Sequence, residues 1–254
     1  MDRVTPPAAP PLAAVFLRLF TVQASWNYDR LIGVGMGVAE EPLLRGLKGP
    51  SGDGAAYRAA VARGAHFFNA HPYLCGLAVG AAARAEYDGA PPEQVERLRT
   101  ALCGPLGALG DRLVWAGWLP LLSAAAIAAI ALGAGWGAVA GFLLIYNVGH
   151  VALRWWALRA GWAAGAGVVG ALRSPVLQSG PGLVLPAMAL VAGFCLPLAA
   201  RWLVRPFPLV PAVGCALAAA LGVALLRWRP GRIKSLWLGL VAVALGIAGG
   251  WVWR

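Results

Sequence analysis

The feature that most limits what this chain can fold into is the absence of acidic residues after Asp111. Residues 1–111 contain ten acidic and ten basic side chains, so the net charge of +11 comes entirely from the acid-free remainder. The chain is 60% hydrophobic and 12% charged, whereas an ordinary soluble domain has roughly a quarter of its residues charged. Its mean hydropathy of +0.70 agrees with this bias. The composition predicts an all-α integral membrane protein.

Five apolar runs in the second half are each about long enough to cross a hydrocarbon core of roughly 30 Å. They cover residues 113–132, 138–156, 183–202, 209–226 and 236–253. Tryptophans and basic residues gather at the ends of these runs, where they are expected to contact lipid headgroups. The basic residues predict a cytoplasmic N-terminal half and an external C-terminus, and their placement argues against nucleic-acid binding.

The chain divides into three expected regions. Residues 1–11 are Pro-rich and predict a disordered tail, without the long apolar core of a signal peptide. Residues 12–112 predict amphipathic and re-entrant helices, and residues 113–254 predict the transmembrane helices.

The stretch at residues 103–120, CGPLGALGDRLVWAGWLP, stands between the two main regions. It is too apolar for a solvated loop and too rich in Gly and Pro for an ordinary helix, so we expect broken backbone at the membrane edge. Irregular backbone and a carboxylate such as Asp111 are tolerated at membrane depth where they line a cavity. Transporters build substrate sites from such breaks.

Residues 12–47 are expected to form one helix, because aromatic and polar residues recur at steps of three and four. This spacing places the amides of Gln23 and Asn27 on the same face as aromatic rings. Such amides either hydrogen-bond a neighbouring helix or contact a ligand, and spacing alone leaves both roles open.

A second helix is expected over residues 55–71, where Pro72 would end it. Asn69 and His71 would then stand at a helix end beside unpaired backbone groups, a common arrangement at binding sites. The next apolar segment, residues 74–85, is short enough for a re-entrant limb. A charged connection over residues 86–100 would lead back to the glycine-rich stretch.

Other polar residues suggest no metal or cofactor. The four cysteines are far apart in apolar surroundings and predict small buried side chains. His66, Asn69 and His71 offer no further metal ligand at a suitable spacing. Asn147 and His150 share a face of one apolar run, where an interhelical hydrogen bond and a role in a substrate path remain equally open. No nucleotide-binding loop, nucleophile elbow or cofactor fingerprint is present, so we expect no catalytic chemistry of its own.

Four blocks resemble, in the same order, those of the IID membrane subunit of mannose-family phosphotransferase systems. They are FLRLFTVQASWNYDRLIGVGMG (residues 16–37), HFFNAHPYLCG (66–76), CGPLGALGDRLVW (103–115) and IYNVGHVALRWWALRAGW (145–162). The closing SLWLGLVAVALGIAG also resembles that family's last span.

The resemblance implies a transport subunit in a bacterial cytoplasmic membrane. In that family, IID pairs with the polytopic subunit IIC, the heterodimers trimerise, and the pair carries a hexose across the membrane. The cytoplasmic proteins IIA and IIB deliver the phosphoryl group to the sugar. The resemblance therefore implies IIC, IIA and IIB as partners, membrane lipid as surroundings, and no cofactor.

Sugar recognition needs groups that both donate and accept hydrogen bonds, together with an apolar ring face. The matched blocks supply these as Gln23, Trp26, Asn27, Asn69, His71 and Asp111.

Two departures from the family pattern favour an alternative. The family has a threonine and an arginine where this chain has Trp118 and Leu119, and its polar segment before the last spans is here reduced to RWLVRPFPLVP. A non-transporting scaffold that anchors IIA- and IIB-like proteins is therefore the second hypothesis.

Overall fold

The computed structural model describes residues 6–48 and 54–204, with side chains described as far as Cys195. The chain separates into two units, Met1–Cys195 and Leu196–Arg254, and the following description concerns the first. Its described residues form helices and no strand, apart from two isolated backbone bridges, which confirms the predicted helical class. In chain order the elements are α1 (Leu12–Leu19), α2 (Gly33–Leu44), the 3-10 helix η1 (Arg45–Lys48), α3 (Ala55–Gly64), α4 (Cys75–Tyr87), α5 (Pro92–Gly110), the π-helix η2 (Asp111–Trp118), α6 (Leu119–Ala131), α7 (Trp136–Ala164), the 3-10 helix η3 (Gly165–Arg173) and α8 (Pro175–Val204).

The single helix expected over residues 12–47 is wrong, because α1 ends at Leu19 and α2 begins at Gly33. Between them the chain turns repeatedly, and Leu31 adopts a left-handed backbone conformation with φ of 49°. The next expected helix is also shorter than predicted, since α3 ends at Gly64, seven residues before His71. In both cases a loop replaces the predicted helical turns, and the two loops lie against each other.

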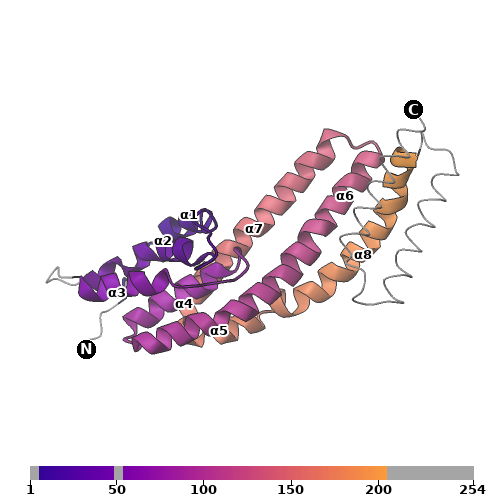
Figure 1. Ribbon diagram of the computed structural model, residues 1–254. Coiled ribbons are helices and arrows are strands. Elements are labelled where there is room, and N and C mark those ends of the chain that lie inside the picture. Colours follow the sequence, from indigo (N-terminus) through magenta and orange to yellow (C-terminus); the bar gives the residue numbers. More distant parts are fainter. Residues whose placement is uncertain (1–5, 49–53, 205–254) are drawn as a thin grey trace. The chain divides into compact units, whose positions relative to one another are not determined.

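The core forms where α4 packs along the C-terminal half of α7 (Figure 1). Every residue of α4 except Arg84 and Glu86 is buried. Its glycines permit close approach, since a Cβ on Gly80 would overlap the backbone of Trp162 and one on Gly161 would overlap Leu77 O. Gly76 and Gly80 make the small-xxx-small spacing that brings two helices together in membranes.

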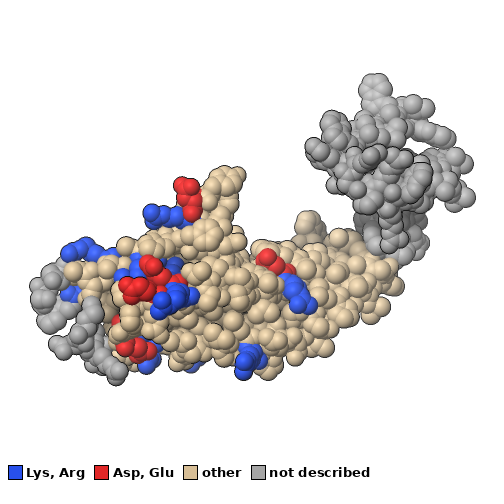
Figure 2. Space-filling model, turned by 60° about the horizontal axis from the view of Figure 1, so that its bottom comes forward, with Lys and Arg blue, Asp and Glu red and all other residues tan. Residues whose placement is uncertain are grey.

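Charged side chains gather around α2 to α5. Glu40 and Arg99 form a buried ion pair at 3.0 Å, and Arg99 also donates to Gly64 O at 2.6 Å. Burial raises the pKa of Glu40, whereas the Arg99 guanidinium opposes that rise. Arg63 and Glu86 form a second ion pair at 2.7 Å. In the view of Figure 2, charges concentrate over the N-terminal elements and most of the remaining described surface is free of them.

The predicted break at residues 103–120 is also wrong, because α5, η2 and α6 form one helical run, Pro92–Ala131. The run carries Pro105 within α5 and changes to a π-helix at Asp111. A π-helical turn keeps the backbone hydrogen-bonded while it shifts the side chains around the axis, and it is frequent at functional sites. Two glycines of this run allow close contacts, since a Cβ on Gly110 would overlap His71 and one on Gly117 would lie 2.8 Å from Val184.

Two helical runs in the described residues are long and apolar enough to cross a membrane, Pro92–Ala131 and Trp136–Cys195. The second run contains α7 and the first part of α8, joined by η3. Figure 1 shows α6 beside α7, and Val184 of α8 lies close to Gly117 of η2. The predicted span at 183–202 falls within α8, and those at 209–226 and 236–253 lie outside the described residues.

Candidate functional site

The candidate site is built on two paired loops, residues 20–32 between α1 and α2 and residues 65–74 between α3 and α4. Ile32 N donates to Phe68 O at 3.2 Å, and Phe68 N donates to Arg30 O at the same distance. The glycines of α2 allow the loops to approach it closely. A Cβ on Gly33 would overlap His66 O, and one on Gly35 would overlap Val22 O.

Asn27 shapes the first loop rather than presenting its amide on a helix. Its Oδ1 accepts from the backbone N–H groups of Asp29 and Arg30 at 3.1 and 2.9 Å, and its Nδ2 donates to Ser25 O at 3.1 Å. This side-chain turn offers the backbone an alternative to helical hydrogen bonds. These bonds stay within the loop, so the amide of Asn27 does not make the helix-to-helix bond considered from sequence.

Gln23 and Trp26 lie in the same loop and are exposed. Trp26 keeps 48% of its surface accessible and packs edge-on against Tyr28, which is 88% exposed. The loop therefore presents an amide and two aromatic rings at the surface of the described protein.

His71 and Asn69 have opposite surroundings in the second loop. Asn69 is exposed, whereas His71 is only 2% exposed. The imidazole of His71 packs against Tyr73 at 4.8 Å and Trp115 at 4.9 Å between ring centres. Its Nδ1 accepts from Tyr73 N at 3.2 Å, so the neutral ring carries its proton on Nε2. That Nε2 is buried and has no hydrogen-bond partner among the described residues.

The electrostatics of His71 keep it neutral. The residue lies in a loop outside both candidate spans. Burial and, to a smaller extent, the positive charge of Arg154 together lower the pKa of His71 to about 4. A neutral, buried imidazole with a free N–H can donate one hydrogen bond, but it cannot act as a cation near neutral pH.

Asp111 is the first residue of η2 and is exposed. Its neighbour Gly110 packs directly on His71, and this contact places the start of the π-helix beside the second loop. The structure thus groups His71, Gly110 and Trp115, while the carboxylate of Asp111 stays at the surface.

Arg154 is the residue that sequence reasoning missed, since it was counted only as a charge that sets orientation. It comes from α7, is 5% exposed, and donates from one Nη to Leu19 O at 2.6 Å and Pro72 O at 3.2 Å. The rings of Phe20 and Tyr73 lie 5.0 and 4.5 Å from its guanidinium carbon. In the described part of the chain no carboxylate pairs with it. One cation therefore holds the end of α1, where the first loop begins, and the second loop against α7.

A signal for Arg154 was present in the sequence. Tyr146, His150 and Arg154 recur every four residues, which places them along one face of a helix. In a half without acids, a buried arginine has to use carbonyl groups and aromatic rings as partners.

The same face of α7 continues as a polar and aromatic cluster. Tyr73 and Tyr146 share a hydrogen bond of 2.6 Å between their hydroxyl groups, and the His150 ring stacks on Tyr73 at 5.0 Å. Asn147 Oδ1 lies 3.0 Å from His150 Nε2, and Asn147 Nδ2 donates to Leu143 O. The bonds of Asn147 thus stay within α7, in contrast to the interhelical bond considered from sequence.

The described residues hold no group of three or more His, Cys, Asp or Glu side chains placed to bind a metal. Cys75, Cys103 and Cys195 are free thiols, and Cys215 lies outside the described residues. The arrangement provides hydrogen-bond donors, acceptors and aromatic surface, which suit binding of a neutral polar ligand.

Comparison with known proteins identifies related chains. The sequence profile of the IID component of the mannose/fructose/sorbose-family phosphotransferase system matches residues 10–181. The sorbose-specific EIID component of Klebsiella pneumoniae is 34% identical over 175 residues, which cover 66% of this chain and 61% of that protein. The mannose-specific EIID component of Escherichia coli K12 is 26% identical over 175 residues, covering 66% and 60%. The chain therefore spans about three fifths of the length of these curated relatives.

Two solved structures share the fold. One is a chain of the mannose transporter ManYZ in complex with microcin E492, with a TM-score of 0.56, 24% identity and 94% of each chain covered. The other, described as a membrane protein, has a TM-score of 0.68, 22% identity and the same coverage. The profile match includes both loops, α5, η2 and α7. This chain belongs to the IID component family of the mannose/fructose/sorbose phosphotransferase system, and it is a membrane protein.

Proposed function

We propose that this chain works with a IIC subunit to carry a hexose across a bacterial cytoplasmic membrane, while IIB phosphorylates the sugar. The family match over residues 10–181 carries the proposal, because it covers both paired loops and the helix that holds them. The related proteins are named for sorbose, mannose and fructose, which are all hexoses. Residues 12–112 would carry the substrate site and residues 113–254 the remaining membrane helices.

The six proposed site residues divide into two roles. Gln23, Trp26, Asn69 and Asp111 are exposed and would contact the sugar or the partner that completes the site. Amides bond hydroxyl groups in both directions, and an indole ring packs under the C–H face of a sugar. Asn27 and His71 would hold the two loops in position, Asn27 through its turn and His71 through its contacts with Gly110 and Trp115.

The test is phosphoenolpyruvate-dependent sugar uptake into membrane vesicles that contain the complete complex, with and without this chain. Mannose, fructose and sorbose should be supplied separately. Uptake that requires the chain supports transport. Recruitment of IIA- and IIB-like proteins to the membrane, without uptake of any hexose tested, would instead favour the scaffold.

A further inference from the structure

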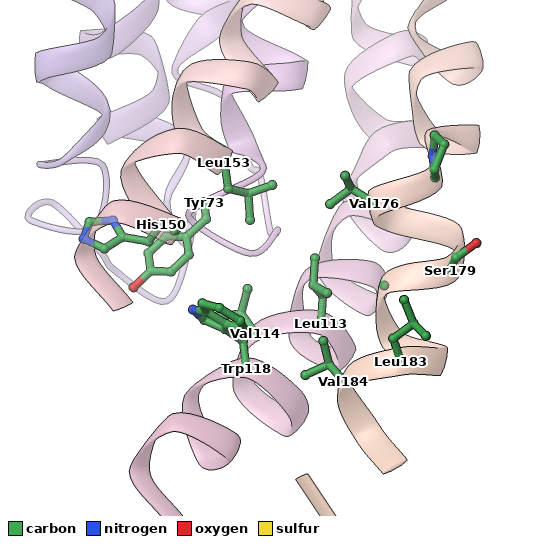
Figure 3. Close-up of a pocket in the computed structure, with 13 residues that line it drawn as sticks. Tyr73, Leu113, Val114, Trp118, His150, Leu153, Val176, Ser179, Leu183 and Val184 are labelled. Carbon is green, nitrogen blue, oxygen red and sulfur yellow. The ribbon is translucent and has the colours of Figure 1, made fainter. Parts of the chain in front are cut away.

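A cavity of about 490 Å³ lies between the loop at Tyr73, the π-helix η2, α7 and the first half of α8. Figure 3 shows Leu113, Val114 and Trp118 on one wall, with Val176, Leu183 and Val184 of α8 on another. The α8 residues that line it recur at steps of three and four, so a single face of that helix borders the cavity. The cavity is separate from Gln23, Trp26 and Asn69, which do not line it.

The chemistry of the lining excludes the sugar. The few polar groups at the wall include Tyr73, His150 and Ser179, and the hydroxyl of Tyr73 is already bonded to Tyr146. A hexose placed here would leave most of its hydroxyl groups without hydrogen-bond partners, which is unfavourable for buried polar groups. The cavity is therefore suited to an apolar ligand.

The position of the cavity indicates the source of that ligand. Its walls come from both helical runs that can cross a membrane. At its rim, Val176 and Leu183 remain 53% and 73% exposed. In a bilayer, the molecules that meet such a rim are lipid acyl chains.

Charge near the start of α8 selects the type of lipid. Arg173 is exposed and comes two residues before Pro175, which lines the cavity. No acidic residue follows Asp111 anywhere in the sequence. A basic side chain at the end of an apolar wall is complementary to a lipid phosphate, and the attraction increases with the negative charge of the headgroup.

We propose that this cavity binds one acyl chain of an anionic glycerophospholipid whose phosphate pairs with Arg173. The inference goes beyond sugar transport and does not depend on which sugar is carried. Photo-crosslinking tests it on the full chain in lipid vesicles. The probes are phosphatidylglycerol and phosphatidylcholine, each with a photoreactive group on one acyl chain, and the labelled peptides are mapped by mass spectrometry.

Labelling should concentrate at residues 113–118 and 176–184, several-fold above residues 143–148 of α7, which are exposed apart from Tyr146. The phosphatidylglycerol probe should label the cavity about fivefold more than phosphatidylcholine, as expected for one basic residue near the headgroup. Arg173→Gln should remove the preference for phosphatidylglycerol but keep the labelling of the cavity. The control Arg159→Gln, at another exposed arginine, should keep the preference and the labelling. Val176→Trp, which fills the cavity from its exposed rim, should reduce labelling by either probe.

Two results would overturn the proposal. Labelling of the cavity no stronger than that of residues 143–148 would show only general contact with the bilayer. Loss of cavity labelling when a IIC subunit is added would assign the cavity to a partner helix. Neither result depends on sugar uptake, so failure here is distinguishable from failure of the proposed transport function.

Discussion

Gly110 of α5 packs directly against the imidazole of His71, in a loop nearly forty residues earlier in the chain. A Cβ on Gly110 would overlap the Cβ of His71 and lie 2.5 Å from its Cγ. Since His71 is buried, it cannot move aside freely. Glycine is therefore required at this position because of the contact with the second loop. The backbone conformation itself is helical and does not require it.

Gly110→Ala should destabilise the protein by about 1–3 kcal/mol, because the added methyl group forces His71 or α5 to shift. Gly104→Ala is the matched control, since a Cβ there meets nothing within 4 Å on the same helix. That change should be neutral or stabilise by up to about 1 kcal/mol. Thermal unfolding of both variants in detergent measures the difference, and equal midpoints would show that the contact carries no stability.

Arg154→Met should destabilise the protein by about 3–5 kcal/mol, because it leaves the carbonyl groups of Leu19 and Pro72 without their buried donor. The aliphatic part of methionine retains some packing, so the loss reports mainly on the guanidinium. Arg159→Gln on the exposed side of α7 should change stability by less than about 0.5 kcal/mol. Limited proteolysis at residues 20–32 and 65–74 should increase for Arg154→Met alone. Unchanged cleavage would separate Arg154 from loop positioning.

Asn69→Ala should lower the apparent sugar affinity by about ten- to a hundredfold, which corresponds to roughly 1–3 kcal/mol for one or two lost hydrogen bonds. Because Asn69 is exposed, the fold and the assembly with IIC should survive. Calorimetry of sugar binding to the purified complex measures the effect.

Asn27→Ala is the contrasting variant, since its side chain holds the backbone of Asp29 and Arg30. It should reduce stability as well as binding. Normal sugar affinity in the Asn69→Ala complex would refute the assignment of Asn69 to the substrate site.

The pH dependence of stability should reflect His71. Its pKa is about 4 in the folded protein and about 6.5 in an unfolded chain, so the unfolded state binds more protons between these values. The stability associated with neutral His71 is complete above pH 6.5 and is lost as the pH falls towards 4, by up to about 3 kcal/mol. Glu40 has the opposite effect, because burial raises its pKa. The stability associated with its protonated form is lost as the pH increases. In a plot of the unfolding midpoint against pH, His71→Gln should reduce the decrease of the midpoint at acidic pH. An unchanged profile would exclude His71 as the group responsible.

The helical membrane class could be predicted from the sequence alone, and the four matched blocks also indicated the family and the candidate site residues. Composition and hydrophobic periodicity are sufficient for the helical membrane class, because burial of apolar helices in lipid depends on the average character of each segment. The two-loop arrangement was beyond that reasoning. The spacing of Gln23 and Asn27 fits a helix, but the Asn27 side chain bonds the backbone of Asp29 and Arg30, which favours a turn over a helix at this point.

Which residues meet depends on the tertiary packing. The contact of Gly110 with His71, the bond from Arg154 to Leu19 O across 135 residues, and the stacking of His150 on Tyr73 join segments that are distant in sequence. Glycine at 110 has no local backbone reason, and Arg154 has no acid nearby to indicate its partner. Hydrophobic periodicity shows which face of a helix is buried, but it does not identify the groups that this face contacts. Those groups depend on how the two loops pack against α7. For Arg154 this packing provides carbonyl groups and aromatic rings in place of carboxylates.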